Sequence, residues 1–245
     1  MTLAPEVLCV DSGLNAEWWG TCDYFAALSR MEALQHSLIE GRGENVVAYL
    51  EHLPVITYGR ATPREDLPRV KFECPVVEVP RGGLATYHGP GQLVGYCIVN
   101  LRLQQGDSSP DIHSYIRALE QALIEFIRDT WELPAVRSLG RTGVWVHAHN
   151  GQLRKIASIG IHVRRWVTSH GFALNLASDL SMFRKIVPCG IRDAEMTSVE
   201  RELRERGRLS EAQLVTQGDA LRRIAKLFHP YLVTQFRAGG WLSES

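Results

Sequence analysis

The stretch that decides the fold class is VWVHAHNGQLRKIASIGIHVRRWVTSHGFALNL, residues 144–176. It begins as a strand, reaches the hairpin turn signal Asn150-Gly151, and continues in two further strands at 155–163 and 171–176. Strands that follow one another this closely pair as hairpins. The stretch therefore predicts a mainly antiparallel or mixed sheet.

Helical patterns flank these strands. One helix is predicted from Thr21, as its cap, to about Gly41, and another from the cap Ser109 through Pro110 to about Trp131. The C-terminal part of the chain is helical again. No linker or repeat divides the sequence, so we expect one α+β domain over residues 1–245. The remaining predicted features are strands at 45–50, 76–79 and 93–101 and the capping boxes Thr197–Glu200 and Ser210–Gln213.

The composition is that of a globular protein. Of the 245 residues, 45% are hydrophobic and 22% charged, which argues against a disordered or fibrous chain. Basic and acidic residues number 27 each, so a dedicated nucleic-acid binder is not expected. Residues 137–208 nevertheless hold 13 basic and six acidic side chains. This local excess is either a solvated surface or a face that attracts an acidic partner.

The N-terminal segment, the cysteines and the histidines indicate where the protein is located and whether it binds a metal. The N-terminal segment lacks a cationic leader and a signal-peptide core, and no apolar run approaches the ~20 residues of a membrane helix. Five cysteines with no CxxC pair fit reduced thiols. His147 and His149 have no convincing third ligand nearby. We therefore expect a cytoplasmic protein without a metal site.

Cys189 is the strongest candidate nucleophile. It follows Pro188 and precedes Gly190, a turn that presents a side chain, whereas Cys9 and Cys97 lie in apolar strands. Basic residues close to Cys189 in sequence would raise its thiolate fraction. The alternative is a structural loop cysteine.

Lys155 is the candidate cation beside that thiolate. It starts the apolar, small-residue strand KIASIG, residues 155–160. A lysine in such a place either extends along the surface to solvent or points into a pocket. The second arrangement would suit pairing with a thiolate.

A glycine-rich loop, RGGLATYHGPGQ at residues 81–92, is the candidate binding loop. Its four glycines and one proline permit close approach of backbone to a ligand, and polar side chains stand among them. It matches neither the Walker A pattern nor the dinucleotide fingerprint GxGxxG. A plain surface loop would not explain this density of polar residues.

These motifs together resemble the lipoyl(octanoyl) transferases. The resemblance covers about residues 45–200 and rests on several motifs in the family's order. They are HLPVITYG at 52–59, RGGLATYH at 81–88 with GPGQ and Tyr96, KIASIG at 155–160, HGFALN at 170–175 and Pro188-Cys189-Gly190.

The resemblance implies a fold and a reaction. The fold is that of the biotin and lipoate protein ligases, a curved mixed sheet flanked by helices. The reaction transfers octanoyl or lipoyl from acyl carrier protein to a lysine of lipoyl domains, those of 2-oxoacid dehydrogenase E2 subunits and of the glycine cleavage H protein. It would be the first step of endogenous protein lipoylation, without ATP, cofactor, metal, nucleic acid or membrane.

The resemblance also implies roles for single residues. Cys189 would carry the acyl thioester, and Lys155 would lower its pKa. The implied substrate-binding residues are Arg81, Gly82, Gly83, Leu84, Ala85, Thr86, Tyr87, His88, Ser158, Ile159, Gly160, Gly171, Phe172 and Ala173.

Two other functions remain open at this point. An ATP-dependent lipoate or biotin ligase of the same fold would keep the loop and the lysine but would not need Cys189. A silent lipoyl-domain or fatty-acid binding module would need neither catalytic side chain, and the presence of both Lys155 and Cys189 weighs against it.

Overall fold

The computed structural model of the chain describes residues 5–11, 13–60, 62–66, 72–103, 111–186, 195–216 and 219–242. Within these residues nine strands form the main sheet, and three strands form a smaller one. The main sheet runs, in spatial order, through β1 (Glu6–Asp11), β2 (Leu14–Cys22), β3 (Val46–His52), β7 (Gln92–Ile98), β11 (Val167–Asn175), β10 (Leu153–Arg164), β9 (Arg141–His147) and β8 (Ala135–Ser138), and β12 (Glu195–Met196) pairs with β10.

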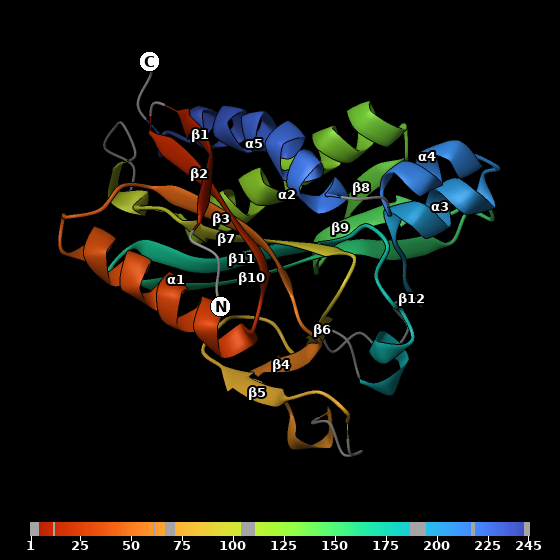
Figure 1. The fold of residues 1–245 in the computed structure, drawn as a ribbon, viewed down its shortest axis with the longest axis horizontal. Coiled ribbons are helices and arrows are strands. Elements are labelled where there is room, and N and C mark those ends of the chain that lie inside the picture. The colour runs from red at the N-terminus through yellow and green to blue at the C-terminus, as the bar shows by residue number, and fades with distance from the viewer. Residues whose placement is uncertain are drawn as a thin grey trace.

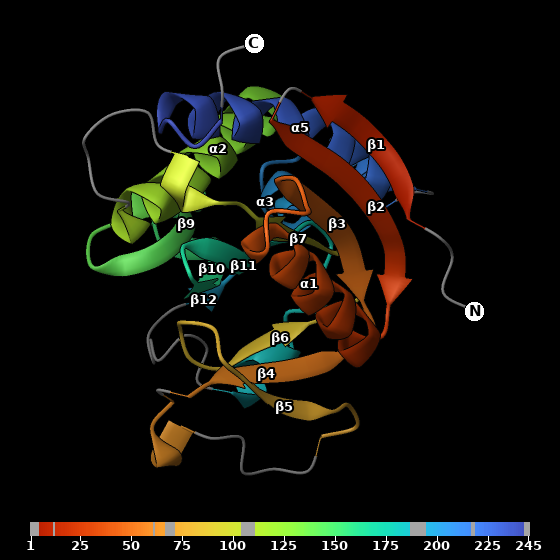
Figure 2. The ribbon, with the colours of Figure 1, turned by 90° about the vertical axis from the view of Figure 1, so that its left-hand side faces the viewer.

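The main sheet is mixed, as expected. The pairs β2–β3 and β10–β12 are parallel, whereas the other neighbours are antiparallel. Figure 2 shows the sheet curving at β1 and β2. The hairpin of β9 and β10 forms, but residues 148–152 connect the strands where the sequence predicted a two-residue turn.

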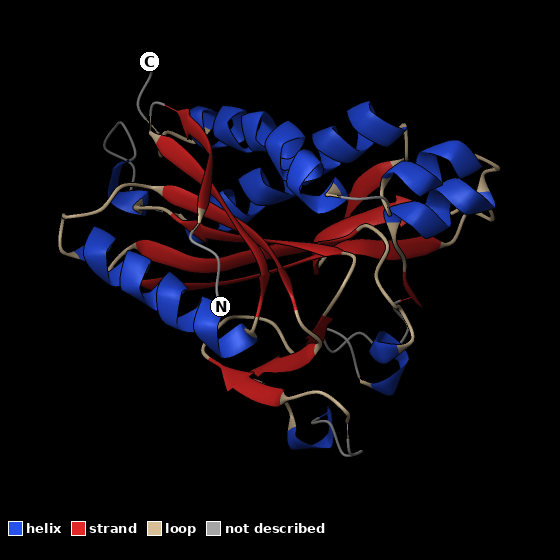
Figure 3. Cartoon of the chain, in the orientation of Figure 1, coloured by secondary structure: helices blue, strands red, loops and turns tan. Residues whose placement is uncertain are grey.

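Helices cover both faces of the main sheet. The helices α2 (Ile112–Trp131) and α5 (Ala220–Ala238) lie on one face and α1 (Tyr24–Ile39) on the other (Figures 1 and 3). The central strands are therefore apolar throughout. In β3, for example, Val47 and Tyr49 join the core under α2 and α5, while Ala48 and Leu50 join the core under α1.

The structure also contains a smaller sheet, two short helices and three 3₁₀ turns among the described residues. The sheet β5-β4-β6 lies below the main sheet in Figures 1 and 2. The remaining elements are β4 (Val55–Gly59), β5 (Val76–Val79), β6 (Thr86–His88), α3 (Val199–Glu205), α4 (Leu209–Leu214) and the short 3₁₀ turns Arg64–Asp66, Leu101–Leu103 and Met182–Lys185.

The helix starts differ from the predicted caps. Asp23, not Thr21, caps α1, because its carboxylate accepts from the backbone N–H of Phe25 and Ala26. Ser198, not Thr197, caps α3. No side-chain cap hydrogen bond begins α4 at the predicted Ser210 box. Asp111 caps α2; the predicted Ser109 and Pro110 lie outside the described residues.

A buried ion network joins α3 to the paired strands β10 and β12. The guanidinium of Arg154 lies 2.6 Å from Glu205, 3.2 Å from Glu202 and 3.2 Å from Glu195. Glu202 is fully buried and also accepts a hydrogen bond from Thr197 Oγ1 at 2.7 Å. Several partners therefore satisfy this buried carboxylate.

We predict that Arg154→Met lowers the free energy of unfolding by about 2 kcal/mol, because it removes one of the two guanidinium partners of buried Glu202 and leaves Arg206 at 2.6 Å. Urea denaturation measures the change. The matched control is Arg201→Met, whose guanidinium pairs with Glu195 and Glu205 at the surface and is expected to cost about 1 kcal/mol or less. Equal losses in the two variants would contradict this account.

Candidate active site

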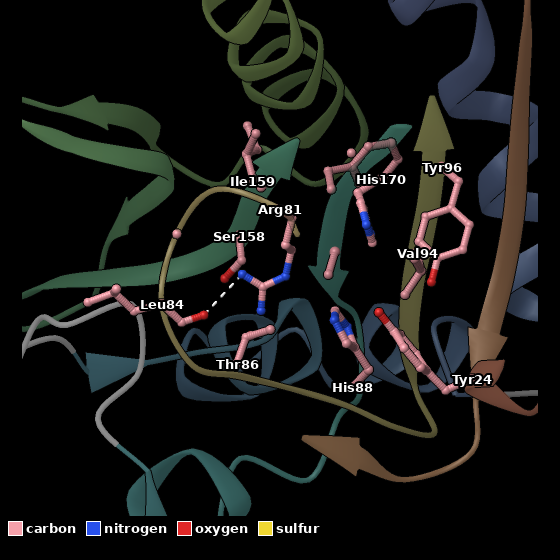
Figure 4. Close-up of a pocket in the computed structure, with 15 residues that line it drawn as sticks. Tyr24, Arg81, Leu84, Thr86, His88, Val94, Tyr96, Ser158, Ile159 and His170 are labelled. Carbon is pink, nitrogen blue, oxygen red and sulfur yellow. Dashed lines mark hydrogen bonds between the residues drawn. The ribbon is translucent and has the colours of Figure 1, made fainter. Parts of the chain in front are cut away.

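The loop that begins at Arg81 is fixed by the planar guanidinium of Arg81 itself. One terminal nitrogen donates to the Leu84 carbonyl at 3.0 Å, as Figure 4 shows, and the other donates to Oγ1 of Thr57 at 2.7 Å. A guanidinium presents its donors in a rigid fork, so it can hold two segments in a fixed relation. Arg81 thereby ties the loop to β4.

Close backbone contact brings the same loop against β10. The N–H of Gly82 donates to the carbonyl of Ile161 at 2.9 Å. A Cβ on Gly160 would lie 2.9 Å from the carbonyl oxygen of Gly82. The loop can approach β10 this closely only because position 160 has no side chain.

A pocket of about 480 Å³, counting its open mouth, lies between this loop, β10, β11, β7 and α1. Only about 40 Å³ of this space is open to a water-sized sphere, so the pocket is narrow in this structure. Eleven of the fourteen residues predicted to bind substrate line it, namely Arg81, Gly83, Leu84, Thr86, His88, Ser158, Ile159, Gly160, Gly171, Phe172 and Ala173. Their role in binding stays a prediction.

Three predicted residues do not line the pocket. Ala85 and Tyr87 are buried behind it, where the Tyr87 ring packs edge-on against Phe183. Gly82 contacts β10 through its backbone. Conversely, Tyr24, Val94, Tyr96 and His170 line the pocket without having been predicted.

Histidine and tyrosine side chains from four elements meet at the centre of the pocket (Figure 4). His52 is held behind them: Nδ1 lies 3.3 Å from the carbonyl of Cys22, and Nε2 lies 2.7 Å from the hydroxyl of Tyr96. A carbonyl can only accept, so Nδ1 carries the proton and Tyr96 donates to Nε2. The His52 and His88 rings lie 5.7 Å apart.

Burial keeps these imidazoles neutral. Desolvation is the largest cause that lowers the pKa of His52 to about 4, and those of His88 and His170 to about 3. The neighbouring His52 lowers the pKa of His88 further, and Arg81 does so for His170. Nε2 of His170 is buried and has no hydrogen-bond partner among the described residues. The pocket thus offers neutral ring nitrogens to a ligand.

Lys155 is buried, at 2% exposure, so the surface-extended alternative is wrong. Its Nζ lies 5.7 Å from the centre of the Trp145 ring. Pairing with β9 skips Ile156, which is a β-bulge, and Ile156 and Ala157 therefore both face the core under α2 and α5. The bulge therefore turns Lys155 toward the same face of β10 as Ser158, which lines the pocket. Lys155 itself does not line the pocket.

Cys189 lies outside the described residues, which end at Ile186 and resume at Glu195. Ile186 and Met196 belong to the same buried cluster as Ala85 and Tyr87 of the loop. Met196 is also the register partner of Lys155 in the β10–β12 pair. Ile186 and Met196, on either side of the segment that contains Cys189, therefore both lie beside the loop. Met196, on the C-terminal side, also lies beside Lys155.

The described residues include Cys9, Cys22, Cys74 and Cys97. None of them lines the pocket. Burial raises the pKa of Cys97 to about 12, and burial is also the largest cause that raises the pKa of Cys22 and Cys74. Cys9, predicted to be a small buried residue, is exposed on β1.

Several of the 13 basic residues in 137–208 are paired with glutamates. Arg154, Arg201, Arg204, Arg206 and Arg208 each form ion pairs with glutamates, most of them in the same region. Because Glu195, Glu200, Glu202 and Glu205 are already counted among the six acidic residues, these pairs fix where the charges lie without removing the excess. Within the described residues, no helix is long and apolar enough to cross a membrane, and no three His, Cys, Asp or Glu side chains gather as metal ligands.

The buried histidines predict a loss of stability in acid. The unfolded chain takes up protons below the ordinary histidine pKa of 6.5, whereas the folded chain does so only near pH 3–4. Each such ring therefore costs about 1.4 kcal/mol of unfolding free energy per pH unit as pH falls from 6.5. We predict that in His170→Asn the unfolding free energy declines with falling pH less steeply, by about 1.4 kcal/mol per pH unit. Asparagine tolerates the φ of 57° at this position.

Urea titrations between pH 4.5 and 7 measure the slope. The matched control is His149→Asn at an exposed position, which is expected to decline as the wild type does. Parallel curves for all three proteins would show that His170 takes up its proton equally in the folded and unfolded chains.

Comparison with known proteins shows the family to which the chain belongs. Residues 23–217 match the family model of the lipoyl protein ligase A/B catalytic domain. An octanoyltransferase of Clavibacter michiganensis is 40% identical over 235 residues, covering 94% of this chain and 91% of the relative. One of Salinispora arenicola is 45% identical over 185 residues, covering 75% and 83%.

Solved structures share the fold. A bipartite lipoate protein ligase studied with its E2 lipoyl domain from Thermoplasma acidophilum superposes with a TM-score of 0.54, at 16% identity, over 97% of this chain and 99% of that chain. A lipoate-protein ligase A bound with ATP gives 0.52 at 17% identity, over 91% and 97%. The expected α+β fold is confirmed. The chain belongs to the lipoyl(octanoyl) transferase family, within the lipoyl protein ligase A/B catalytic domains, and is an acyltransferase.

Proposed function

We propose that this acyltransferase moves an octanoyl group from the phosphopantetheine thioester of acyl carrier protein to a lysine of a lipoyl domain, by way of a thioester on Cys189. The observation that carries the proposal is the buried position of Lys155 on the pocket face, beside the strand to which the chain returns after Cys189. The shared name of the relatives supports octanoyl as the group transferred. Lipoyl domains of 2-oxoacid dehydrogenase E2 subunits and the glycine cleavage H protein are the proposed acceptors.

The first step requires a thiolate. Its sulfur attacks the acyl carbonyl carbon, and the bond to the pantetheine sulfur breaks, so that one thioester replaces another. The ammonium of Lys155 would stabilise the thiolate form of Cys189. The apolar part of the pocket supports an aliphatic acyl chain; it comprises Leu84, Val94, Ile159, Phe172 and Ala173.

The second step makes the transfer run forward. The amine of the acceptor lysine attacks the acyl carbon, the bond to Cys189 breaks, and a stable amide forms. One amine proton must reach the leaving sulfur, and Lys155 would carry it. Since the donor thioester is already activated, no ATP enters the proposed reaction.

Intact-protein mass spectrometry after mixing with octanoyl-acyl carrier protein, without ATP, tests the covalent route. We predict one octanoyl adduct that hydroxylamine removes and that is absent in Cys189→Ala. Free octanoate is assayed in the same tube, because rapid hydrolysis would hide an adduct. Absence of both adduct and octanoate would favour an ATP-dependent ligase, and binding of acyl carriers with no turnover under any condition would favour a silent binding module.

Gly143 offers a test of the placement of Lys155. A Cβ at this position would lie 2.6 Å from Lys155 Cε and 2.6 Å from the carbonyl oxygen of Ala157. We predict that Gly143→Ala displaces the lysine and lowers kcat/KM for octanoyl transfer about 100-fold.

The matched control is Gly140→Ala. Gly140 also has a positive φ, 72° against 120° at Gly143, but a Cβ there meets nothing within 4 Å. Its φ lies near the left-handed region that other residues can adopt, so Gly140→Ala tests a Cβ at a positive φ with less strain than at Gly143 and without the contact with Lys155. Urea unfolding of both variants separates loss of fold from loss of placement, and similar transfer rates in the two would refute the prediction.

A further inference from the structure

A chain of side-chain amides fixes the orientation of His88. Nδ2 of Asn175 donates to the carbonyl of Thr197 at 3.0 Å. Nε2 of Gln92 donates to Oδ1 of Asn175 at 2.9 Å and to the carbonyl of Tyr87 at 3.2 Å. Backbone carbonyls only accept hydrogen bonds, so each of the two amides must turn its nitrogen toward its carbonyl. Two backbone oxygens thus anchor the whole chain.

The tautomer of His88 follows from this arrangement. The remaining oxygen of Gln92, Oε1, lies 2.7 Å from Nδ1 of His88 and can only accept. Nδ1 therefore carries the proton, and Nε2 of the neutral ring is an acceptor. Among the described residues Nε2 has no hydrogen-bond partner, and the ring points into the pocket (Figure 4). A pKa lowered to about 3, chiefly by burial, agrees with a neutral ring.

The surroundings of His88 define which group it would bind. The charged or titratable side chains around it are Arg81, His52 and His170, with Tyr24 and Tyr96 nearby, and the described pocket lining contains no carboxylate. A guanidinium repels an ammonium, and nothing described in the pocket would compensate one. A neutral amine fits, because it offers N–H donors to Nε2 and carries no charge.

We propose that Nε2 of His88 accepts a hydrogen bond from the neutral amine of the acceptor lysine and so aims its lone pair at the acyl carbon. This inference rests on the proposed function. In the transfer step the C–N bond forms, the C–S bond breaks, and its electron pair leaves on the sulfur of Cys189. One amine proton passes by Lys155 to that sulfur. The other stays on nitrogen as the amide N–H, and it is this hydrogen that His88 holds.

Gln92 and Asn175 are positioning residues in this scheme. Both are buried, at 1% exposure each, and neither lines the pocket. They act through His88: Gln92 accepts from its Nδ1, and Asn175 prevents the Gln92 amide from turning over.

The experiment compares two nucleophiles on preformed octanoyl-enzyme by rapid quench. A lipoyl domain attacks as an amine, whereas the thiol of holo-acyl carrier protein attacks as a thiolate and has no N–H for His88 to hold. His88→Asn can keep a donor toward Gln92 but lacks an acceptor at the place of Nε2. We expect it to slow transfer to the lipoyl domain about 100-fold, and to slow return to the carrier thiol far less.

His88→Gln is the second variant, because its side-chain oxygen can reach about where Nε2 lies. We expect His88→Gln to transfer octanoyl to the lipoyl domain at least tenfold faster than His88→Asn does. Equal slowing of amine and thiol transfer, or no rescue by glutamine, would overturn the assignment of His88. A wild-type enzyme that forms neither an octanoyl adduct nor free octanoate would instead overturn the proposed function itself, so the two failures are distinguishable.

Discussion

The structure depends most on the burial of one lysine. The side chain of Lys155 lies inside the molecule, where an amine must be surrounded by suitable groups or lose more hydration energy than it regains. The bulge at Ile156 turns it to the pocket face, the Trp145 ring lies within cation–π range, and the absence of a side chain at Gly143 leaves it room. All three features belong to the paired strands β9 and β10.

The support of this lysine extends to a helix on the opposite face of the sheet. The N–H of Gly143 donates to Glu120 of α2 at 2.9 Å. Glu120 is fully buried and also pairs with Arg117 at 2.6 Å and Arg137 at 3.3 Å. A buried carboxylate with three donors is difficult to displace. The geometry of the strand next to Lys155 is therefore fixed by a residue that does not touch the pocket.

Much of the site could be predicted because its residues fall in contiguous motifs. The loop at 81–88 and the strands at 158–160 and 171–173 bring most of the predicted residues to one pocket. Tyr24 was missed as a lining residue because it reaches the site from α1, an element distant in sequence, and Tyr96, although part of the loop motif, was not assigned to substrate binding. His170 was quoted within a motif, but its approach depends on a left-handed backbone, φ 57°, that the sequence does not signal.

The bulge at Ile156 and the ion pairs of residues 137–208 could not be predicted from the sequence. A strand period of two would put Lys155 on the same face as Ala157, and a single unpaired residue, Ile156, reverses this. Likewise, the sum of charges over 137–208 counts residues along the sequence, whereas ion pairing depends on where the side chains lie in space. Arg154 reaches across from β10 to glutamates of α3 and β12 in the same segment, so these pairs fix where the charges lie but leave the excess of the segment unchanged. Recognition of an acidic carrier must therefore be argued from the positions of single charges, not from their total.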